Sequence, residues 1–306
     1  MNEIDLTVNI GSLKLKNPIL LASGTVGYGN EISEFIDLSK IGAIVTKSIS
    51  LKPRKGNPPS RITETSSGML NAIGLANVGL DKFVEEKIPF LEKLESTIIC
   101  NVAASSVEEY SQCVEQLDSQ SAVKAFEINV SCPNVKDGGL VFGNDVSWVG
   151  KITNAVRGKT DKPIIIKLSP NNSKISDFAE VAKKEGADAV SAINTLVGTA
   201  FNIWTRKPKI KNITGGLSGP AIKPVALAKV LEISRNVEIP IIGIGGINKW
   251  QDAVEFMIAG ASAFQIGTAN FINPVVSIEI LKSLINYCKK MSIKNISKLT
   301  ASYNLS

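Results

Sequence analysis

The sequence predicts a single (β/α)8 barrel, and three observations lead to that fold class. The chain has 306 residues, 44% of them hydrophobic and 20% charged, which suits one large globular domain spanning residues 1–306. Short apolar runs rich in β-branched residues alternate with amphipathic stretches, the pattern of βα units around a parallel sheet. Eight such runs occur, and eight strands with eight crossovers in a domain of this length indicate a closed barrel.

The expected elements begin with a hairpin and continue with the barrel strands. Residues 4–10 and 13–16 alternate polar and apolar side chains around Gly11 and Ser12, which predicts a short β-hairpin at the N-terminal mouth of the barrel. The barrel strands are expected at 18–23, 43–48, 97–103, 125–131, 163–169, 189–194, 240–246 and 263–268. Helical patterns between them include Val107 to Leu117, Ile175 to Glu185, Pro224 to Ser234 and Trp250 to Ala259. Two insertions, Ile49 to Gly79 and Thr195 to Pro220, exceed ordinary loop length, which favours a functional role at the C-terminal mouth.

Histidine is absent from the chain, and this excludes several kinds of active site. A Ser-His-Asp triad, a Cys-His dyad and a two-histidine metal site cannot form, so a base working near pH 7 must be cysteine, lysine or a carboxylate. The four cysteines, at positions 100, 113, 132 and 288, make no CxxC pair, so we expect no disulfide, zinc or iron–sulfur site within this chain.

Charge and sequence ends predict the compartment and the class of ligand. The net charge is +6, but the lysines are dispersed, which favours an anionic small molecule over nucleic acid. The first residues carry acids and alternate apolar with polar side chains, unlike a signal or transit peptide. No apolar run reaches the roughly 18 residues that span a bilayer. We therefore expect a cytoplasmic protein with no membrane partner.

Polar side chains and glycine pairs follow the predicted strands at the points where they end. Asparagine and lysine are poor choices inside a strand, and their joint placement around one mouth favours ligand binding over helix capping. Two adjacent glycine-containing pairs predict a phosphate site, because bare backbone N–H groups can hold an anion there. The candidates are Ser23, Lys47, Asn101, Asn129, Cys132, Lys167, Asn194, Gly245-Gly246 and Gly267-Thr268.

Cys132 lies in the most informative stretch, Glu127-Ile-Asn-Val-Ser-Cys-Pro-Asn134. A free thiol has a pKa of ~8.5, so a modest shift makes it a usable base or nucleophile. We expect Cys100, Cys113 and Cys288 to pack as small buried side chains. The Gly138-Gly139 pair that follows could hinge a lid over the site.

Through these residues the chain resembles the class 1 dihydroorotate dehydrogenases, flavin enzymes that make orotate for pyrimidine synthesis. The resemblance covers the chain nearly end to end. Such a set of motifs at these intervals is far more specific than a lone glycine motif. The matching segments are Asn17-Pro-Ile-Leu-Leu-Ala-Ser-Gly24, Gly68-Met-Leu-Asn-Ala-Ile-Gly-Leu75, Asn129-Val-Ser-Cys-Pro-Asn134, Ile193-Asn-Thr195, Gly215-Gly-Leu-Ser-Gly-Pro220 and the two glycine pairs.

The resemblance implies one FMN per chain at the C-terminal mouth, and it implies which residues line each ligand. The phosphate would lie on Gly245, Gly246, Gly267 and Thr268. The flavin would be lined by Ser23, Lys47, Ser48, Asn101, Asn129, Lys167, Ile193 and Gly219. The substrate would be held by Lys47, Asn71, Ala72, Ile73, Gly74, Leu75, Asn129, Asn194 and Thr195.

The chemistry implied by the same resemblance is oxidation of dihydroorotate to orotate. Cys132 would remove the proton at C5 while hydride passes from C6 to flavin N5, and an ammonium such as Lys167 would stabilise negative charge near flavin N1. The segment 68–75 resembles class 1B, whose catalytic subunit passes electrons to a partner carrying FAD and a [2Fe-2S] cluster, with NAD+ as the final acceptor. A heterotetramer built on a catalytic homodimer is the implied assembly.

Four other interpretations stay open. A class 1A enzyme is a homodimer that uses fumarate directly, although the segment 68–75 argues against it. A related flavin barrel, as in dihydropyrimidine dehydrogenase, reduces uracil-type rings. A lysine aldolase would use Lys47 or Lys167 as a Schiff base, with phosphate at the glycine pairs and no flavin. A non-enzymatic barrel would keep the fold without the activity.

Overall fold

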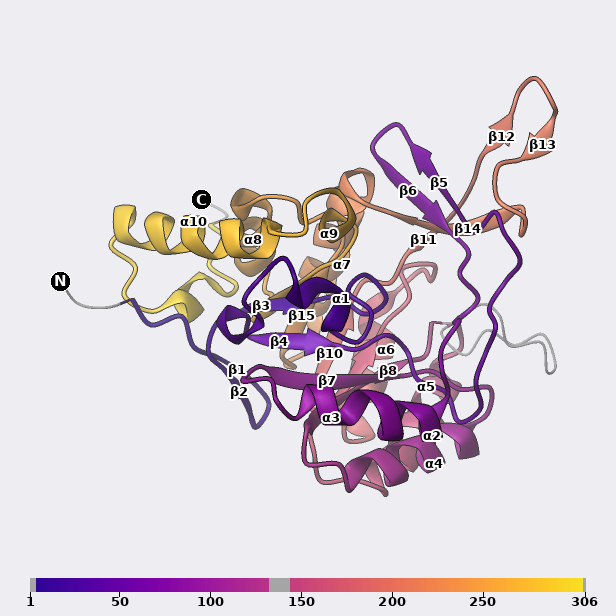
Figure 1. Ribbon diagram of the computed structural model, residues 1–306. Coiled ribbons are helices and arrows are strands. Elements are labelled where there is room, and N and C mark those ends of the chain that lie inside the picture. Colours follow the sequence, from indigo (N-terminus) through magenta and orange to yellow (C-terminus); the bar gives the residue numbers. More distant parts are fainter. Residues whose placement is uncertain (1–3, 132–143, 305–306) are drawn as a thin grey trace.

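A closed barrel of eight parallel strands forms the centre of the computed structural model, which describes residues 4–131 and 144–304 (Figure 1). In chain order the barrel strands are β3 (Ile19–Leu21), β4 (Ala43–Val45), β7 (Thr97–Val102), β8 (Val123–Asn129), β9 (Ile164–Lys167), β10 (Ala189–Ala192), β15 (Ile241–Ile244) and β16 (Ala263–Ile266). The last strand, β16, pairs in parallel with the first, β3, which closes the barrel. Each strand overlaps one of the eight predicted ranges, so the predicted (β/α)8 fold is confirmed.

The strand residues are buried on both faces because helices cover the outside of the barrel. The parallel strands β4, β9, β10, β15 and β16 are buried at every position, as expected where side chains fill the interior and helices pack against the exterior. The strands end earlier than predicted at several places. β4, for example, ends at Val45, although Thr46 and Ile49 still donate their backbone N–H groups to Ile99 O and Asn101 O of β7.

The helices that follow the strands match the predicted amphipathic patterns. The longer ones are α4 (Val107–Asp118), α5 (Val146–Arg157), α6 (Ile175–Lys184), α7 (Lys223–Asn236), α8 (Trp250–Ile258) and α10 (Val276–Lys290). Short helical turns are α1 (Asn30–Ser33), η1 (Leu38–Lys40), α2 (Leu80–Lys82), η2 (Phe83–Lys87), α3 (Ile88–Leu91), η4 (Pro220–Ile222), α9 (Ala269–Ile272) and η5 (Ile296–Leu299). None of the helices in the described part of the chain has both the length and the apolar character needed to cross a membrane.

Local sequence explains where α4 begins and which face it buries. The Ser106 hydroxyl accepts the backbone N–H of Glu109 at 3.2 Å, a cap at the first turn. Tyr110, Cys113, Val114 and Leu117 are the buried residues, and they are spaced at three and four residues along one face. The result is a helix that packs its apolar stripe on β7 and β8.

The predicted N-terminal hairpin is confirmed as β1 (Val8–Ile10) and β2 (Leu13–Leu15). Its tip lies against Asp188, the residue before β10, because a Cβ added at Gly11 would be 2.8 Å from the Asp188 Cβ. Lys16 donates to the carbonyl of Ser39 at 2.6 Å, shortly before β4 begins. These contacts place the hairpin at the N-terminal end of the barrel, as predicted.

The two long insertions fold together into one antiparallel sheet, which the sequence did not predict. Its strands lie in the order β11 (Leu196–Thr199), β14 (Thr214–Ser218), β6 (Gly68–Asn71) and β5 (Ile62–Thr65). The two insertions meet where β14 pairs with β6. A small hairpin, β12 (Phe201–Asn202) with β13 (Lys207–Pro208), extends beyond this sheet (Figure 1). The insertions therefore build a lip over one side of the C-terminal mouth.

Candidate functional site

A carboxylate inside the barrel gathers polar side chains from four other strands. Glu127 lies on β8 and is completely buried. Its Oε1 accepts from Asn101 Nδ2 at 2.7 Å and faces Lys167 Nζ at 3.2 Å. Its Oε2 accepts from Ser191 Oγ at 2.9 Å and from Gln265 Nε2 at 2.5 Å. This polar layer lies one step below the C-terminal ends of the strands.

The ammonium of Lys167 lies at the end of β9 and is held by an ion pair. Only 8% of its side chain is exposed, and its partner Glu127 has no exposure. A cation removed from water to this degree requires a counter-charge and further hydrogen bonds, because desolvation otherwise outweighs what burial gains. The pair therefore fixes one positive charge at the floor of the mouth.

Asn101 connects this layer to the loop after β4. Ser48 donates its hydroxyl to Asn101 Oδ1 at 2.5 Å, and the backbone N–H of Asn101 donates to Thr46 Oγ1 at 3.1 Å. Ser48 follows Lys47, which is partly buried. Three of the predicted residues, Lys47, Ser48 and Asn101, are thus brought to one side of the mouth.

Asn129 and Asn194 join the ends of β8 and β10. Asn194 Nδ2 donates to Asn129 Oδ1 at 3.2 Å. The backbone N–H of Ser131 donates to the same oxygen at 3.2 Å, and the Ser131 hydroxyl donates to the carbonyl of Lys167 at 2.9 Å. The side-chain oxygen of Asn194 also accepts the N–H of Thr195 at 2.8 Å. These contacts hold two amides side by side at the mouth.

The predicted substrate segment 71–75 comes to the same side through the inserted sheet. Asn71 Nδ2 donates to Gly216 O at 3.2 Å. Thr195 packs against Gly216, because a Cβ there would be 2.7 Å from the Thr195 Cβ. Both Gly74 and Leu75 have positive φ, 72° and 55°, which marks a tight turn just after β6. Ala72 and Ile73 lie between Asn71 and this turn and hydrogen-bond through their backbones to Arg61 and Asn57.

Gly245 and Gly246 follow the end of β15 and lie close to the start of α7; we call this place the glycine cradle. Gly245 and Gly246 have φ of 131° and 73°. A Cβ at Gly246 would be 2.8 Å from the Lys223 Cβ and 2.9 Å from the carbonyl oxygen of Gly219, and a Cβ at Gly245 would be 2.7 Å from Ala226. The backbone here can approach only because side chains are missing. Backbone N–H groups beside a helix start suit an anion.

The remaining predicted residues surround this cradle. Thr268 donates its hydroxyl to Ser218 Oγ at 2.8 Å, next to Gly219. Ile193 is buried and its Cγ1 would be 3.5 Å from a Cβ at Gly245. Ser23 follows Ala22, which lies beside Gly267. The predicted phosphate residues and several predicted flavin residues therefore lie together.

Cys132 and the Gly138-Gly139 hinge lie outside the described residues. The described chain stops at Ser131, which is tied to β9 through the carbonyl of Lys167. The other three cysteines are free and buried, as predicted. Burial raises the pKa of Cys100 to about 12 and that of Cys113 to about 12, and it raises the pKa of Cys288 as well.

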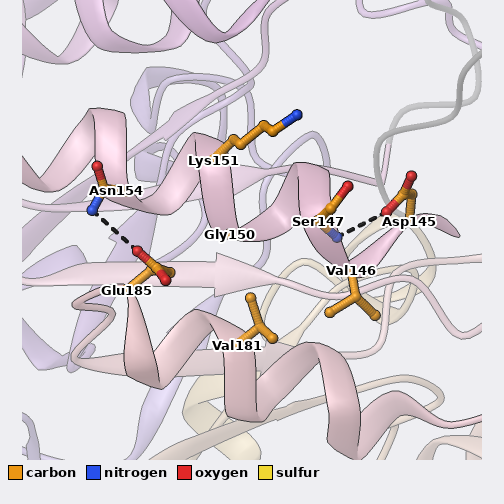
Figure 2. A pocket seen from close by; sticks show the side chains of 8 residues that line it. All are labelled: Asp145, Val146, Ser147, Gly150, Lys151, Asn154, Val181 and Glu185. Atoms are coloured by element: carbon orange, nitrogen blue, oxygen red, sulfur yellow. Dashed lines mark hydrogen bonds between the residues drawn. The ribbon is translucent and has the colours of Figure 1, made fainter.

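A separate groove lies on the outside of the barrel between α5 and α6 (Figure 2). Gly150 lets the helices approach, because a Cβ there would be 2.9 Å from Val181 Cγ1. Asn154 donates to Glu185 Oε2 at 3.1 Å across the groove. None of the candidate site residues lines it, so we interpret it as a space between packed helices.

Sequence reasoning missed Glu127, Ser191 and Gln265, which form the polar layer beneath the site. Glu127 and Gln265 stand inside otherwise apolar runs that form buried strands. Charged and amide side chains are seldom fully buried unless they are paired. A polar residue within an apolar run is visible in the sequence, and Glu127 and Gln265 could have been identified from it.

Comparisons with known proteins agree on one family. The family model described as dihydroorotate dehydrogenase matches residues 5–288. A protein of Pelobacter propionicus is 52% identical over 96% of this chain and 97% of its own length. Relatives in Geotalea daltonii and Parabacteroides distasonis are 50% and 48% identical over 98% of this chain, and over 98% and 99% of their own lengths. All three relatives bear the name dihydroorotate dehydrogenase B (NAD(+)), catalytic subunit.

Proposed function

Because the chain belongs to the dihydroorotate dehydrogenase family, we propose that it oxidises dihydroorotate to orotate in the synthesis of pyrimidines, as the catalytic subunit of an NAD+-linked enzyme. The observation that carries this proposal is the gathering of one ammonium, Lys167, and three amides at a single barrel mouth beside a glycine cradle. The amides are Asn101, Asn129 and Asn194. This combination suits a planar ring of amides next to an anionic cofactor.

The family works with a flavin, and we propose that this flavin is FMN, one per chain. The cradle supports a phosphate ester, because Gly245 and Gly246 let bare backbone lie close to the start of α7, where a Cβ would meet Ala226 or Lys223. Lys167, Asn101 and Ser48 form a polar floor for the ring. The proposed FMN contacts are Ser23, Lys47, Ser48, Asn101, Asn129, Lys167, Ile193, Gly219, Gly245, Gly246, Gly267 and Thr268.

When bound, the flavin supplies an acceptor for the hydride lost from C6 of the substrate. Lys167 holds a positive charge at the ring, where the ion pair with Glu127 fixes it in place. The lip made by the insertions supports exclusion of water from one side of the mouth, which strengthens such electrostatic effects. The protein thus provides charge, orientation and shielding, and the cofactor provides the redox chemistry.

The substrate residues are proposed to hold the dihydroorotate ring and its carboxylate. Asn129 and Asn194 each offer a donor and an acceptor to ring amides, and Lys47 offers an ammonium to the carboxylate. Cys132 is proposed to take the proton from C5. The remaining proposed contacts are Asn71, Ala72, Ile73, Gly74, Leu75 and Thr195.

We further propose a cytoplasmic heterotetramer in which two copies of this chain form a core and each binds a partner with FAD and a [2Fe-2S] cluster. The relatives' names include the words catalytic subunit, which supports a partner chain. On the β12–β13 hairpin, Ile203 and Trp204 are 75% and 88% exposed. Large apolar side chains so exposed are typical of a surface covered by another protein chain.

The alternative functions receive less support. The NAD(+) in the relatives' names favours the NAD+-linked type over one that uses fumarate. An aldolase would use Lys47 or Lys167 as its Schiff base; the family match argues against that activity, and the ammonium of Lys167 is paired with Glu127. The residues matched by the family model, 5–288, include every candidate at the mouth, which favours dihydroorotate over a uracil-type ring.

The first test is a visible absorption spectrum of the purified chain, recorded without air before and after dihydroorotate is added. We expect flavin bands that bleach on addition of dihydroorotate, and acid extraction that releases FMN. Bands that stay oxidised with dihydroorotate but bleach with dihydrouracil would contradict the proposed substrate. A chain that takes up no flavin would overturn the proposed activity.

Gly246→Ala is expected to weaken FMN binding by about tenfold or more, because the new Cβ would meet Lys223 and the Gly219 carbonyl and widen the cradle. Flavin fluorescence titration measures the dissociation constant. The matched control is Gly158→Ala, since Gly158 lies at the end of α5 with its nearest atom 3.7 Å from an added Cβ. Equal affinities in both variants would remove Gly246 from the phosphate site.

A further inference from the structure

The proposed function leaves one buried charge without a role. Glu127 touches neither the glycine cradle nor the pair formed by Asn129 and Asn194, yet it is the most highly connected carboxylate among the described residues of the barrel interior. It accepts from or pairs with side chains of β7, β9, β10 and β16. A negative charge buried so completely is costly even when it is paired, so we ask what its position does for the site.

The two oxygens of Glu127 face different partners. Oε1 faces Asn101 at 2.7 Å and Lys167 at 3.2 Å, both proposed flavin contacts. Oε2 faces Ser191 at 2.9 Å and Gln265 at 2.5 Å, which lie in the layer below the mouth. Because four donors converge, the carboxylate cannot shift without losing several hydrogen bonds. Oε2 thus fixes the carboxylate to the barrel interior, and Oε1 holds the two proposed flavin contacts.

Glu127 also determines which way the Asn101 amide points. Its oxygen takes the N–H₂ end of Asn101, which leaves the amide oxygen to accept from Ser48 at 2.5 Å. Three proposed flavin contacts, Lys167, Asn101 and Ser48, are therefore ordered directly or indirectly by a single carboxylate.

We propose that Glu127 is a positioning residue of the flavin site: it holds the Lys167 ammonium toward the flavin ring and orients the Asn101 amide beside it. This inference rests on the proposed function. Glu127 acts through these neighbours and makes no contact with the substrate. Its effect therefore has to appear in properties of the bound flavin, and turnover changes only as a consequence.

The test compares Glu127→Gln with the unchanged protein, using the full chain with FMN bound. Glutamine keeps the size but removes the charge that holds Lys167 Nζ, so we expect the ammonium to lose its fixed position at the flavin. The preference for reduced over oxidised flavin should then fall about tenfold, a drop of about 30 mV in midpoint potential for a two-electron couple. Redox-dye titration measures the potential. An unchanged potential, or a higher one, would overturn the inference.

Two further variants separate positioning from a merely structural role. In a Lys167→Met background, Glu127→Gln is expected to lower the potential by much less, since only its effect on Asn101 remains; an equal drop in both backgrounds would contradict the proposal. This double variant removes both charges and so leaves none unpaired, which keeps the comparison available if Glu127→Gln alone fails to fold. Ser191→Ala removes a donor from the opposite oxygen and should lower the melting temperature without moving the potential.

The outcomes distinguish this inference from the proposed function. If the unchanged chain binds FMN and Glu127→Gln has the same potential and FMN affinity, only the positioning role is overturned. If Ser191→Ala shifts the potential as much as Glu127→Gln, the effect belongs to general packing of the barrel, and the positioning role is again overturned. If the unchanged chain binds no flavin, the proposed function falls and the inference falls with it.

Discussion

Replacing Cys132 by alanine is expected to leave FMN bound and to slow reduction of the flavin by dihydroorotate by about 10²- to 10⁴-fold, the usual contribution of a positioned general base. Alanine removes the thiol but nothing that the proposed flavin contacts require. The measurement is stopped-flow absorbance without air, which follows the loss of the flavin bands after mixing. Flavin content is determined on the same sample.

No other thiol can take over the role of Cys132. Cys100 and Cys113 are buried, and burial raises their pKa values to about 12, so both thiols stay protonated near neutral pH. Cys288 lies on α10, outside the barrel. Cys113→Ala, which also removes one thiol, is the control and should reduce the flavin at the normal rate.

A matched Cys132→Ser variant separates loss of the base from loss of packing. Serine keeps the shape, but its hydroxyl is a far weaker acid than a thiol, so we expect slow reduction that improves as the pH rises. Reduction at the normal rate in both Cys132→Ala and Cys132→Ser would remove Cys132 as the base.

The barrel was predictable because its signal is local in the sequence. Each strand is a short apolar run such as Ile164 to Ile166, and burial on both faces removes any need for alternation. The inserted sheet was not predictable, because Leu70 on β6 pairs with Leu217 on β14. A contact between residues so far apart leaves no periodic pattern within either insertion.

The residues of the candidate site also fall into two groups, those that the sequence indicates and those that it does not. Lys167, Asn129 and the glycine pairs could be proposed as site residues from the sequence, because their residue types are unusual at strand ends. Glu127 was not a candidate because we considered only polar residues at the ends of the predicted strands. Glu127 lies one layer deeper in the barrel and acts through Lys167 and Asn101. The sequence shows which residues are polar, but the closure of the barrel decides which of them meet.

Lys167→Met is expected to have two separate effects, one on stability and one on rate. It leaves the Glu127 carboxylate buried without its partner, which typically costs about 3–5 kcal/mol of unfolding free energy. It also removes the positive charge at the flavin, and loss of one such electrostatic contact typically slows the reaction by about 10²- to 10³-fold. Urea unfolding measures the first effect, and anaerobic stopped-flow absorbance measures the second.

The double variant Lys167→Met with Glu127→Gln separates these effects, because it removes both members of the buried pair. We expect it to recover much of the stability, since no charge is left unpaired, while the slow flavin reduction persists because the ammonium is still missing. Lys162→Met is the control, since Lys162 lies before the other end of β9 and pairs with Asp118 at 3.9 Å; it should leave the rate unchanged. Recovery of both stability and rate in the double variant would mean that Lys167 serves only to neutralise Glu127, and normal flavin content and reduction rate in Lys167→Met would refute its role at the flavin.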